Sequence, residues 1–148
     1  MTASYDERLL VPWWAWPAGL GLAGLAAAEV HGGAGGLRAV LPYAVAFPLA
    51  VVVLLRMSRG RVRVADGVLH VPGARVPVRL VASAVPVEGA RLRRLSGQLA
   101  DPRAHIATRS WVPTGVRLVL DDPQDETPYW VVSSRHPDRL LDAIAQSR

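Results

Sequence analysis

The chain has 148 residues and a formal net charge of +5, and all 17 of its basic residues are arginines. This length allows one membrane segment together with one small domain. The absence of cysteine excludes disulfides, thiolate metal sites and cysteine nucleophiles. The positive charge needs no nucleic acid to explain it, because a basic domain tethered beside an anionic lipid leaflet is attracted to that leaflet.

The first apolar stretch covers residues 9–30 and carries three tryptophans near its start: Trp13, Trp14 and Trp16. Indole rings at the start of a membrane helix bury their faces while their N–H groups stay near the lipid headgroups. We therefore expect these side chains to anchor the stretch at the membrane interface. The alternative is a pocket in which the rings stack on a ligand.

The second apolar stretch, residues 37–55, has a single charged residue, Arg38, at its edge. At about 1.5 Å per residue it covers roughly 28 Å, which is close to the hydrocarbon thickness of a bilayer. Its helix begins either at Leu37 or at Pro42, since proline suits the first turn of a helix. A glycine-rich turn joins the two stretches, so residues 1–56 are predicted to form a two-helix transmembrane hairpin.

Four arginines follow the second stretch closely: Arg56, Arg59, Arg61 and Arg63. Arginine is concentrated in the cytoplasmic segments of membrane proteins, and each such residue adds about 1 kcal/mol of attraction to an anionic leaflet. The cluster therefore predicts a multi-pass protein of the plasma membrane with both termini in the cytoplasm. The same arginines are candidates for binding lipid headgroups.

Glu29 and His31 form an ionisable pair near the outer end of the first stretch. Ionisable groups at membrane depth are costly and often serve proton or cation transfer. A structural alternative is that Glu29 already lies at the interface, beside a hydrated glycine turn, where it is solvated or caps the turn.

Residues 57–148 are predicted to form a cytoplasmic domain of short alternating strands. Asp66-Gly67 between two valine-rich segments is the signal for a two-residue hairpin turn. A short helix is expected around Leu92, and a terminal helix is expected from Pro137. Seven strands and a terminal helix suggest a small pleckstrin-homology-like β-barrel or sandwich, and thus an α+β membrane protein.

The search for catalytic patterns finds none. The four histidines have no metal-ligand spacing, and the chain has neither a phosphate-binding loop nor a nucleophile elbow. We therefore predict no enzymatic activity, no cofactor and no metal.

Several motifs are distributed over nearly the whole chain: Tyr5-Asp6-Glu7-Arg8, Pro12-Trp13-Trp14, Ala28-Glu29-Val30-His31, Leu41-Pro42-Tyr43, Leu120-Asp121-Asp122-Pro123 and Thr127-Pro128-Tyr129-Trp130. With these motifs the chain resembles an actinobacterial membrane-protein family known as domain of unknown function 3093. The resemblance implies an actinobacterial source and an integral membrane protein. It implies no activity, ligand or catalytic residue.

These observations favour a membrane-anchored binding or scaffold module, whose partner is a protein or the anionic headgroups of the bilayer. An accessory subunit of a larger membrane complex is one alternative, and a homodimer is compatible with either role. A proton-linked membrane enzyme or carrier that uses Glu29 and His31 is another alternative.

Overall fold

The computed structural model describes residues 3–33, 35–98, 100–123 and 126–148, which divide into two compact units. The helical unit is Leu10–Arg59, and the β unit is Met1–Leu9 together with Gly60–Arg148. The helical unit is therefore an insertion between the first two strands, β1 (Ala3–Arg8) and β2 (Arg61–Ala65). The sequence partition at residue 56 had placed β1 with the helices.

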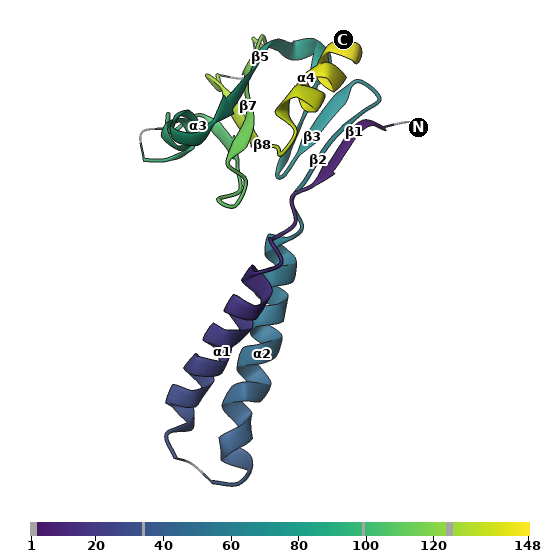
Figure 1. Ribbon diagram of the computed structural model, residues 1–148. Coiled ribbons are helices and arrows are strands. Elements are labelled where there is room, and N and C mark those ends of the chain that lie inside the picture. The colour runs from purple at the N-terminus through teal and green to yellow at the C-terminus, as the bar shows by residue number, and fades with distance from the viewer. Residues whose placement is uncertain (1–2, 34, 99, 124–125) are drawn as a thin grey trace. The chain divides into compact units, whose positions relative to one another are not determined.

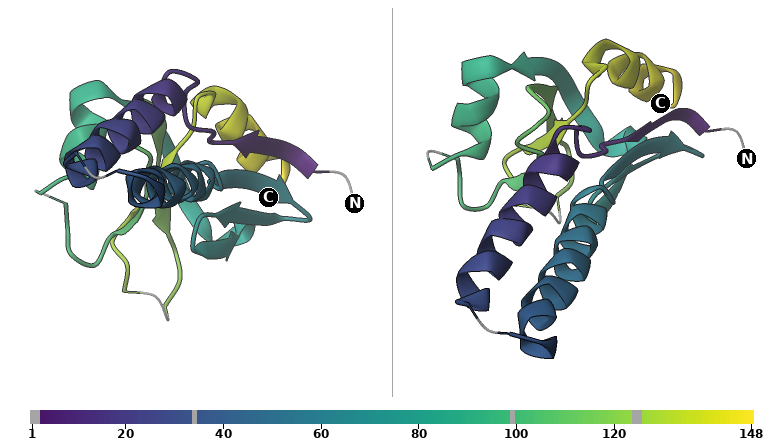
Figure 2. Two further views of the ribbon diagram at one scale, coloured as in Figure 1. Left: turned by 90° about the horizontal axis from the view of Figure 1, so that it is seen from below. Right: turned by 60° about the horizontal axis from the view of Figure 1, so that its bottom comes forward.

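Two antiparallel helices, α1 (Ala15–His31) and α2 (Leu37–Met57), make up the helical unit (Figures 1 and 2). The second helix begins at Leu37 and contains Pro42, so the later of the two predicted starts is wrong. The two helices approach closely where α1 has a small residue. A β-carbon placed on Gly19 would lie 3.2 Å from the side chain of Leu54, which is buried.

The predicted two-helix transmembrane hairpin, and with it the multi-pass architecture, is wrong. In the described ranges only α2 is long and apolar enough to cross a membrane. It has 21 residues, and its 18-residue apolar window has a mean hydropathy of 2.1. The first apolar stretch does not form one long helix, because Leu9 continues the sheet by donating its N–H to the Gly60 carbonyl at 2.8 Å. Residues 10–14 connect the sheet to the helix, and α1 has 17 residues.

The first sheet of the β unit has the strand order β1-β2-β3-β4 and is antiparallel throughout. Its other strands are β3 (Val68–Val71) and β4 (Ala74–Pro77). The predicted two-residue hairpin is confirmed, since Ala65 pairs with Val68. Asp66 and Gly67 between them have φ angles of 51° and 72°, as a turn with two left-handed residues requires.

The second sheet has the order β5-β7-β8-β6. A short 3₁₀ helix, η1, precedes it, and α3 lies between its first two strands in the sequence. These elements are η1 (Val78–Leu80), β5 (Val81–Glu88), α3 (Gly89–Ser96), β6 (His105–Ala107), β7 (Thr114–Leu120) and β8 (Trp130–Ser133). The strands β6 and β8 are parallel, whereas the other pairs are antiparallel.

The predicted pleckstrin-homology-like domain is wrong as well. The described residues form two separate four-stranded sheets. The eighth strand is β1, which comes from the N-terminal segment that the sequence analysis assigned to the membrane hairpin. The parallel pairing of β6 with β8 also breaks the simple antiparallel order that consecutive hairpins would give.

The terminal helix α4 (Pro137–Gln146) contacts strands of both sheets, and its start at Pro137 agrees with the sequence prediction. Its buried residues Leu140, Ala143 and Ile144 join the main core of the β unit. They recur at helical spacing, so one face of α4 is apolar and the opposite face is left to solvent.

Candidate binding groove between strand β1 and helix α4

A buried carboxylate lies on β1. Tyr5, Glu7 and Leu9 are at least partly buried, whereas Asp6 and Arg8 are exposed, because successive side chains of a strand point to opposite faces. The Glu7 side chain belongs to the buried set, with 9% exposure. A buried charge is tolerated when hydrogen bonds replace the water that it has lost.

Three donors supply those hydrogen bonds. The Ser134 hydroxyl donates to Glu7 Oε2 at 2.8 Å, and the Arg135 backbone N–H donates to Oε1 at 2.9 Å. The Tyr5 hydroxyl also donates to Oε2. We call Tyr5, Glu7 and Ser134 the clasp, because they fasten β1 to the segment between β8 and α4.

The clasp has the chemistry of a structural network. Burial raises the pKa of Tyr5, and its hydrogen bond to Glu7 raises that pKa further, so the phenol stays protonated and remains a donor. In the described part of the chain, the Ser134 hydroxyl has no histidine or lysine side chain as a hydrogen-bond partner. An activated serine nucleophile would need such a base.

The backbone holds the segment of Ser134 in place. The Ser134 N–H donates to the Thr114 carbonyl at 3.1 Å, and the Thr114 hydroxyl donates to the Ser134 carbonyl at 2.6 Å. The chain passes close by at Gly115, where an added β-carbon would lie 2.4 Å from the Val132 carbonyl oxygen. Pro137 then begins α4 at a position where a helix needs no N–H donor.

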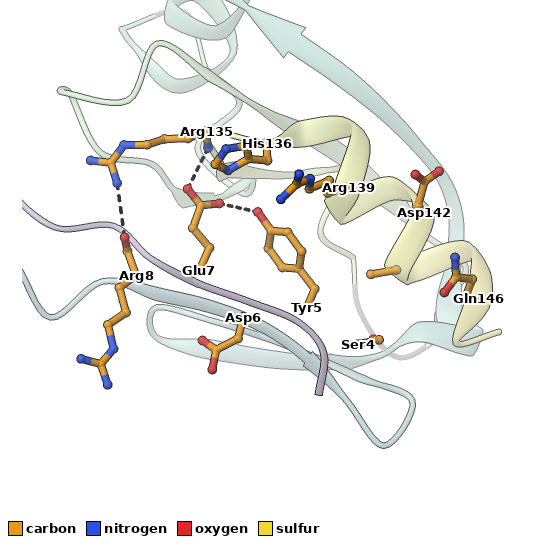
Figure 3. A pocket seen from close by; sticks show the side chains of 11 residues that line it. Ser4, Tyr5, Asp6, Glu7, Arg8, Arg135, His136, Arg139, Asp142 and Gln146 are labelled. Atoms are coloured by element: carbon orange, nitrogen blue, oxygen red, sulfur yellow. Dashed lines mark hydrogen bonds between the residues drawn. The ribbon is translucent and has the colours of Figure 1, made fainter. Parts of the chain in front are cut away.

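A groove with a volume of about 610 Å³ lies between β1 and α4 (Figure 3). The strand forms one wall, and the helix with the two residues before it forms the other. Its lining residues are Ser4, Tyr5, Asp6, Glu7, Arg8, Arg135, His136, Arg139, Asp142, Ala143 and Gln146.

Two of the three carboxylates in this groove are already bound within the β unit. Glu7 is held in the clasp. Asp6 accepts two hydrogen bonds from the Arg61 guanidinium, one of them at 2.7 Å from Nε to Oδ1. That bond is the main reason why the pKa of the Asp6 carboxyl is lowered.

The remaining charge in the groove is mainly positive. Arg8, Arg135 and Arg139 line it, and Asp142 on α4 is the third carboxylate. The Arg135 guanidinium crosses the groove and donates to the Arg8 carbonyl at 3.3 Å (Figure 3). The groove is therefore suited to a ligand with negative charge.

Among the described strands β1 pairs only with β2, so it is an edge strand of its sheet. The Leu9 N–H points toward the β2 side, where it donates to Gly60. Since backbone groups alternate along a strand, the N–H and C=O groups of Asp6 and Arg8 face the outer edge. The hydrogen bond from Arg135 to the Arg8 carbonyl agrees with this direction.

A family model covers every residue that lines the groove except Gln146. A model of the family described as Protein of unknown function (DUF3093) matches residues 4–144. The chain belongs to this family. Comparison with curated proteins and with solved structures found no match. Family membership therefore adds no activity or ligand to the description of the groove.

Within this DUF3093 chain, the four predicted headgroup-binding arginines have different surroundings. Arg56 and Arg59 are exposed at the end of α2 and just after it. Arg61 is paired with Asp6. Arg63 is partly buried, and its Nε has no hydrogen-bond partner in the described ranges. Two of these arginines thus lie at the end of α2, and the other two belong to strand β2.

The predicted tryptophan anchor lies just before and at the start of α1. Trp13 is 81% exposed and Trp14 is 57% exposed, whereas Trp16 is partly buried. Trp13 and Trp14 lie in the turn that begins the helix, where the Ala15 N–H donates to the Pro12 carbonyl at 3.0 Å. Two large rings are thus presented outward, which is compatible with the predicted interfacial role.

Glu29 and His31, the predicted polar pair, have different surroundings. The Glu29 side chain is exposed, and His31 Nδ1 lies 3.1 Å from the Ala39 carbonyl oxygen of α2. The His31 ring also meets the Tyr43 ring edge-on, with 6.2 Å between the ring centres. In the described ranges, no three acidic, histidine or cysteine side chains gather where a metal could bind.

Sequence reasoning missed the groove and the clasp. Tyr5, Glu7 and Leu9 alternate as strand residues do, and this signal was available in the sequence. The strand signal was missed because Glu7, the middle residue of the buried set, is a carboxylate. Its partner Ser134 is 127 positions away. No local pattern links two residues at that separation.

Proposed function

We propose that this protein is a membrane-anchored binding module. Its helix α2 is held in lipid, and the groove between β1 and α4 binds an extended, acidic segment of a partner protein. The partner segment adds a strand to the open edge of β1. The observation that carries this proposal is a sheet edge with outward backbone groups, placed beside a helix in an arginine-lined groove.

The surface of α2 supports the anchoring part. Only 6% of its most apolar window is buried. Large apolar side chains are exposed along both helices, among them Leu25, Val30, Leu37 and Val45. Exposed apolar surface of this extent marks an interaction site, and a helix of this length is suited to lipid.

The end of α2 supports an orientation. Arg56 and Arg59 lie where the chain leaves the helical unit, and arginine in such a position marks the cytoplasmic side. Leu9 and Gly60 are hydrogen-bonded, so β1 and the chain that follows the helical unit belong to one β unit. We therefore propose that the β unit and both termini are in the cytoplasm, beneath the plasma membrane.

The partner's chemistry follows from the charges and the backbone. Main-chain hydrogen bonds to the edge at Asp6 and Arg8 would supply affinity without a sequence requirement. The cations Arg8, Arg135 and Arg139 favour acidic side chains on the incoming strand.

The test uses the full-length protein in lipid nanodiscs and a fluorescent peptide of about eight residues with alternating glutamate and valine, which spans one strand. Fluorescence anisotropy should show binding, and Arg139→Glu should weaken it by about tenfold or more. Arg103→Glu, at an exposed arginine outside the groove, should leave binding unchanged. A peptide of alternating lysine and valine should bind poorly.

The strand-addition step has its own control. Asp6→Pro removes one outward N–H and Asp6→Ala keeps it, while both lose the ion pair with Arg61. Weaker peptide binding to the proline variant than to the alanine variant supports strand addition. Equal peptide affinity of the proline and alanine variants would contradict strand addition. Equal affinity of Arg139→Glu and the unchanged protein for the acidic peptide would contradict the role of charge in the groove.

A further inference from the structure

A second, smaller cavity lies in the β unit between α3 and the segment that leads from β6 to β7. Its volume is about 140 Å³. A water molecule occupies about 30 Å³ of the liquid, so the cavity has room for a group of roughly five non-hydrogen atoms. This is the size of one phosphate group.

The polar side chains that line this cavity are hydrogen-bond donors. They are the two arginines Arg93 and Arg109 and the hydroxyls of Ser96, Thr108 and Ser110. No carboxylate belongs to the lining described for it. The Ser96 hydroxyl is used locally, since it donates to the Leu92 carbonyl at 2.8 Å. The guanidinium groups of Arg93 and Arg109 and the hydroxyls of Thr108 and Ser110 could each donate a hydrogen bond to a bound anion.

Arg109 is fixed in place but its charge is not matched. Its backbone N–H donates to Ser133 Oγ at 2.9 Å, and its carbonyl accepts from the Val112 N–H at 3.0 Å. Its Nε is buried and has no hydrogen-bond partner in the described part of the chain. No salt bridge to Arg93 or Arg109 is found among the described residues. Arg109 is partly buried, and its Nη1 donates to the neighbouring Thr108 carbonyl at 3.4 Å. This bond supplies no counterion, so a bound anion would be stabilised by the guanidinium.

The position of Arg109 in the chain's architecture indicates where that ligand comes from. A β-carbon placed on Gly60 would lie 3.0 Å from Arg109 Nε, so the guanidinium packs against Gly60. Gly60 follows the helical unit directly and is hydrogen-bonded to Leu9, which precedes that unit. We call Leu9 and Gly60 the neck, and the cavity of Arg93 and Arg109 the neck pocket.

We infer that the neck pocket binds the phosphate group of an anionic phospholipid headgroup. This inference rests on the anchoring part of the proposed function, because α2 ends at Met57, three residues before Gly60, and α2 held in lipid would bring the neck to the headgroup layer. Arginine recognises phosphate through paired N–H donors, and Thr108 and Ser110 add hydroxyl donors from the same segment.

The experiment uses full-length protein purified in a non-ionic detergent. Isothermal titration with short-chain phosphatidylglycerol should show binding, and Arg93→Gln should weaken it by about tenfold. Arg94→Gln is the matched control, since Arg94 is exposed on the same helix and does not line the pocket, and it should leave affinity unchanged. Arg109→Gln should weaken binding at least as much as Arg93→Gln does.

Two further probes identify the source of the phosphate. Short-chain phosphatidylcholine and inorganic phosphate should each bind at least about tenfold more weakly than phosphatidylglycerol. If inorganic phosphate binds as tightly as phosphatidylglycerol, and if Arg93→Gln weakens both equally, the lipid assignment is wrong. Equal losses in Arg93→Gln and Arg94→Gln would show only a diffuse charge effect and overturn the pocket.

Folding of the variants and the proposed function are checked separately. Arg109 packs against Gly60, so Arg109→Gln is interpreted only if it unfolds at the same temperature as the unchanged protein. If it does not, Arg93→Gln decides the test, because Arg93 is exposed. Arg139→Glu in the groove should leave lipid affinity unchanged. If the full-length protein remains in solution without detergent, the anchoring part of the proposed function is wrong. If Arg93→Gln but not Arg94→Gln then still loses the response to phosphatidylglycerol, the pocket binds a free anion and the lipid assignment is wrong.

Discussion

The two units use the same apolar residue types in opposite ways. In the β unit Leu69 is 0% exposed and lies in a core formed by both sheets and α4. In the helical unit Leu25 is 68% exposed and Leu37 is 78% exposed. Valine, leucine and alanine are abundant in both units, so composition does not separate them. What separates them is where the side chains point: one unit makes its own interior, and the other presents its apolar surface outward.

The largest effect is expected from dividing the chain at the neck. A fragment of residues 60–148 lacks β1 and with it the clasp, so Val62 and Val64 lose one strand neighbour and it should not fold. Joining residues 1–9 to residues 60–148 through about four glycine and serine residues should restore folding, since Leu9 N and Gly60 O are 2.8 Å apart. Far-ultraviolet circular dichroism and proton NMR dispersion distinguish the two fragments. Equal folding would mean that the β unit does not need its N-terminal strand.

A matched pair of leucine substitutions tests the contrast directly. Leu69→Ala should lower the free energy of unfolding of the β unit by about 3 kcal/mol, because it leaves a cavity in a closed core. Leu25→Ala in full-length protein should leave that free energy unchanged, because Leu25 is exposed on α1. Urea unfolding in detergent measures both. A large cost at Leu25 would show that the helical unit packs against something within the protein.

The clasp should contribute less than the core but still measurably. Glu7→Ala leaves the Tyr5 hydroxyl, the Ser134 hydroxyl and the Arg135 N–H without their acceptor, at a cost of about 2 kcal/mol. Asp142→Ala, at an exposed carboxylate of the same groove, is the control and should have little effect. Thermal unfolding of the two variants side by side gives the comparison.

The smallest effect is a dependence on alkaline pH. The pKa of Tyr5 is raised in the folded protein, so above a pH of about 10 the unfolded chain loses the phenol proton before the folded chain does. Stability from this group is therefore fully present below that pH and falls as the pH rises further. In Tyr5→Phe this part of the alkaline loss should disappear, which urea unfolding at pH 9 and 11 would detect. An unchanged pH profile would mean that Tyr5 titrates alike in both states.

Local signals in the sequence predicted the local elements. Asp66-Gly67 identified the β2–β3 hairpin, because few residues other than glycine and aspartate adopt the left-handed turn that it needs. Pro137 and the spacing of Leu140 and Ile144 identified α4 and its buried face. These features depend on neighbours within a few residues, which a single sequence records.

Long-range features could not be read in the same way. The pairing of β1 with β2, the parallel pair β6 and β8, and the contact between Glu7 and Ser134 each join segments far apart in the chain. The first apolar stretch was misjudged because hydropathy does not register that Leu9 has a backbone partner in the sheet. The groove and the neck pocket depend on these contacts, so neither could be assigned from residue patterns.

The insertion of the helical unit has a consequence for biosynthesis. The ribosome makes β1 first, and Arg61 is made 55 positions after its partner Asp6. During that interval both helices are made, so the first sheet cannot close until the helical unit has been synthesised. A nascent chain that stops within the helical unit therefore carries an unfinished sheet, whose unpaired strand β1 quality-control proteases can recognise.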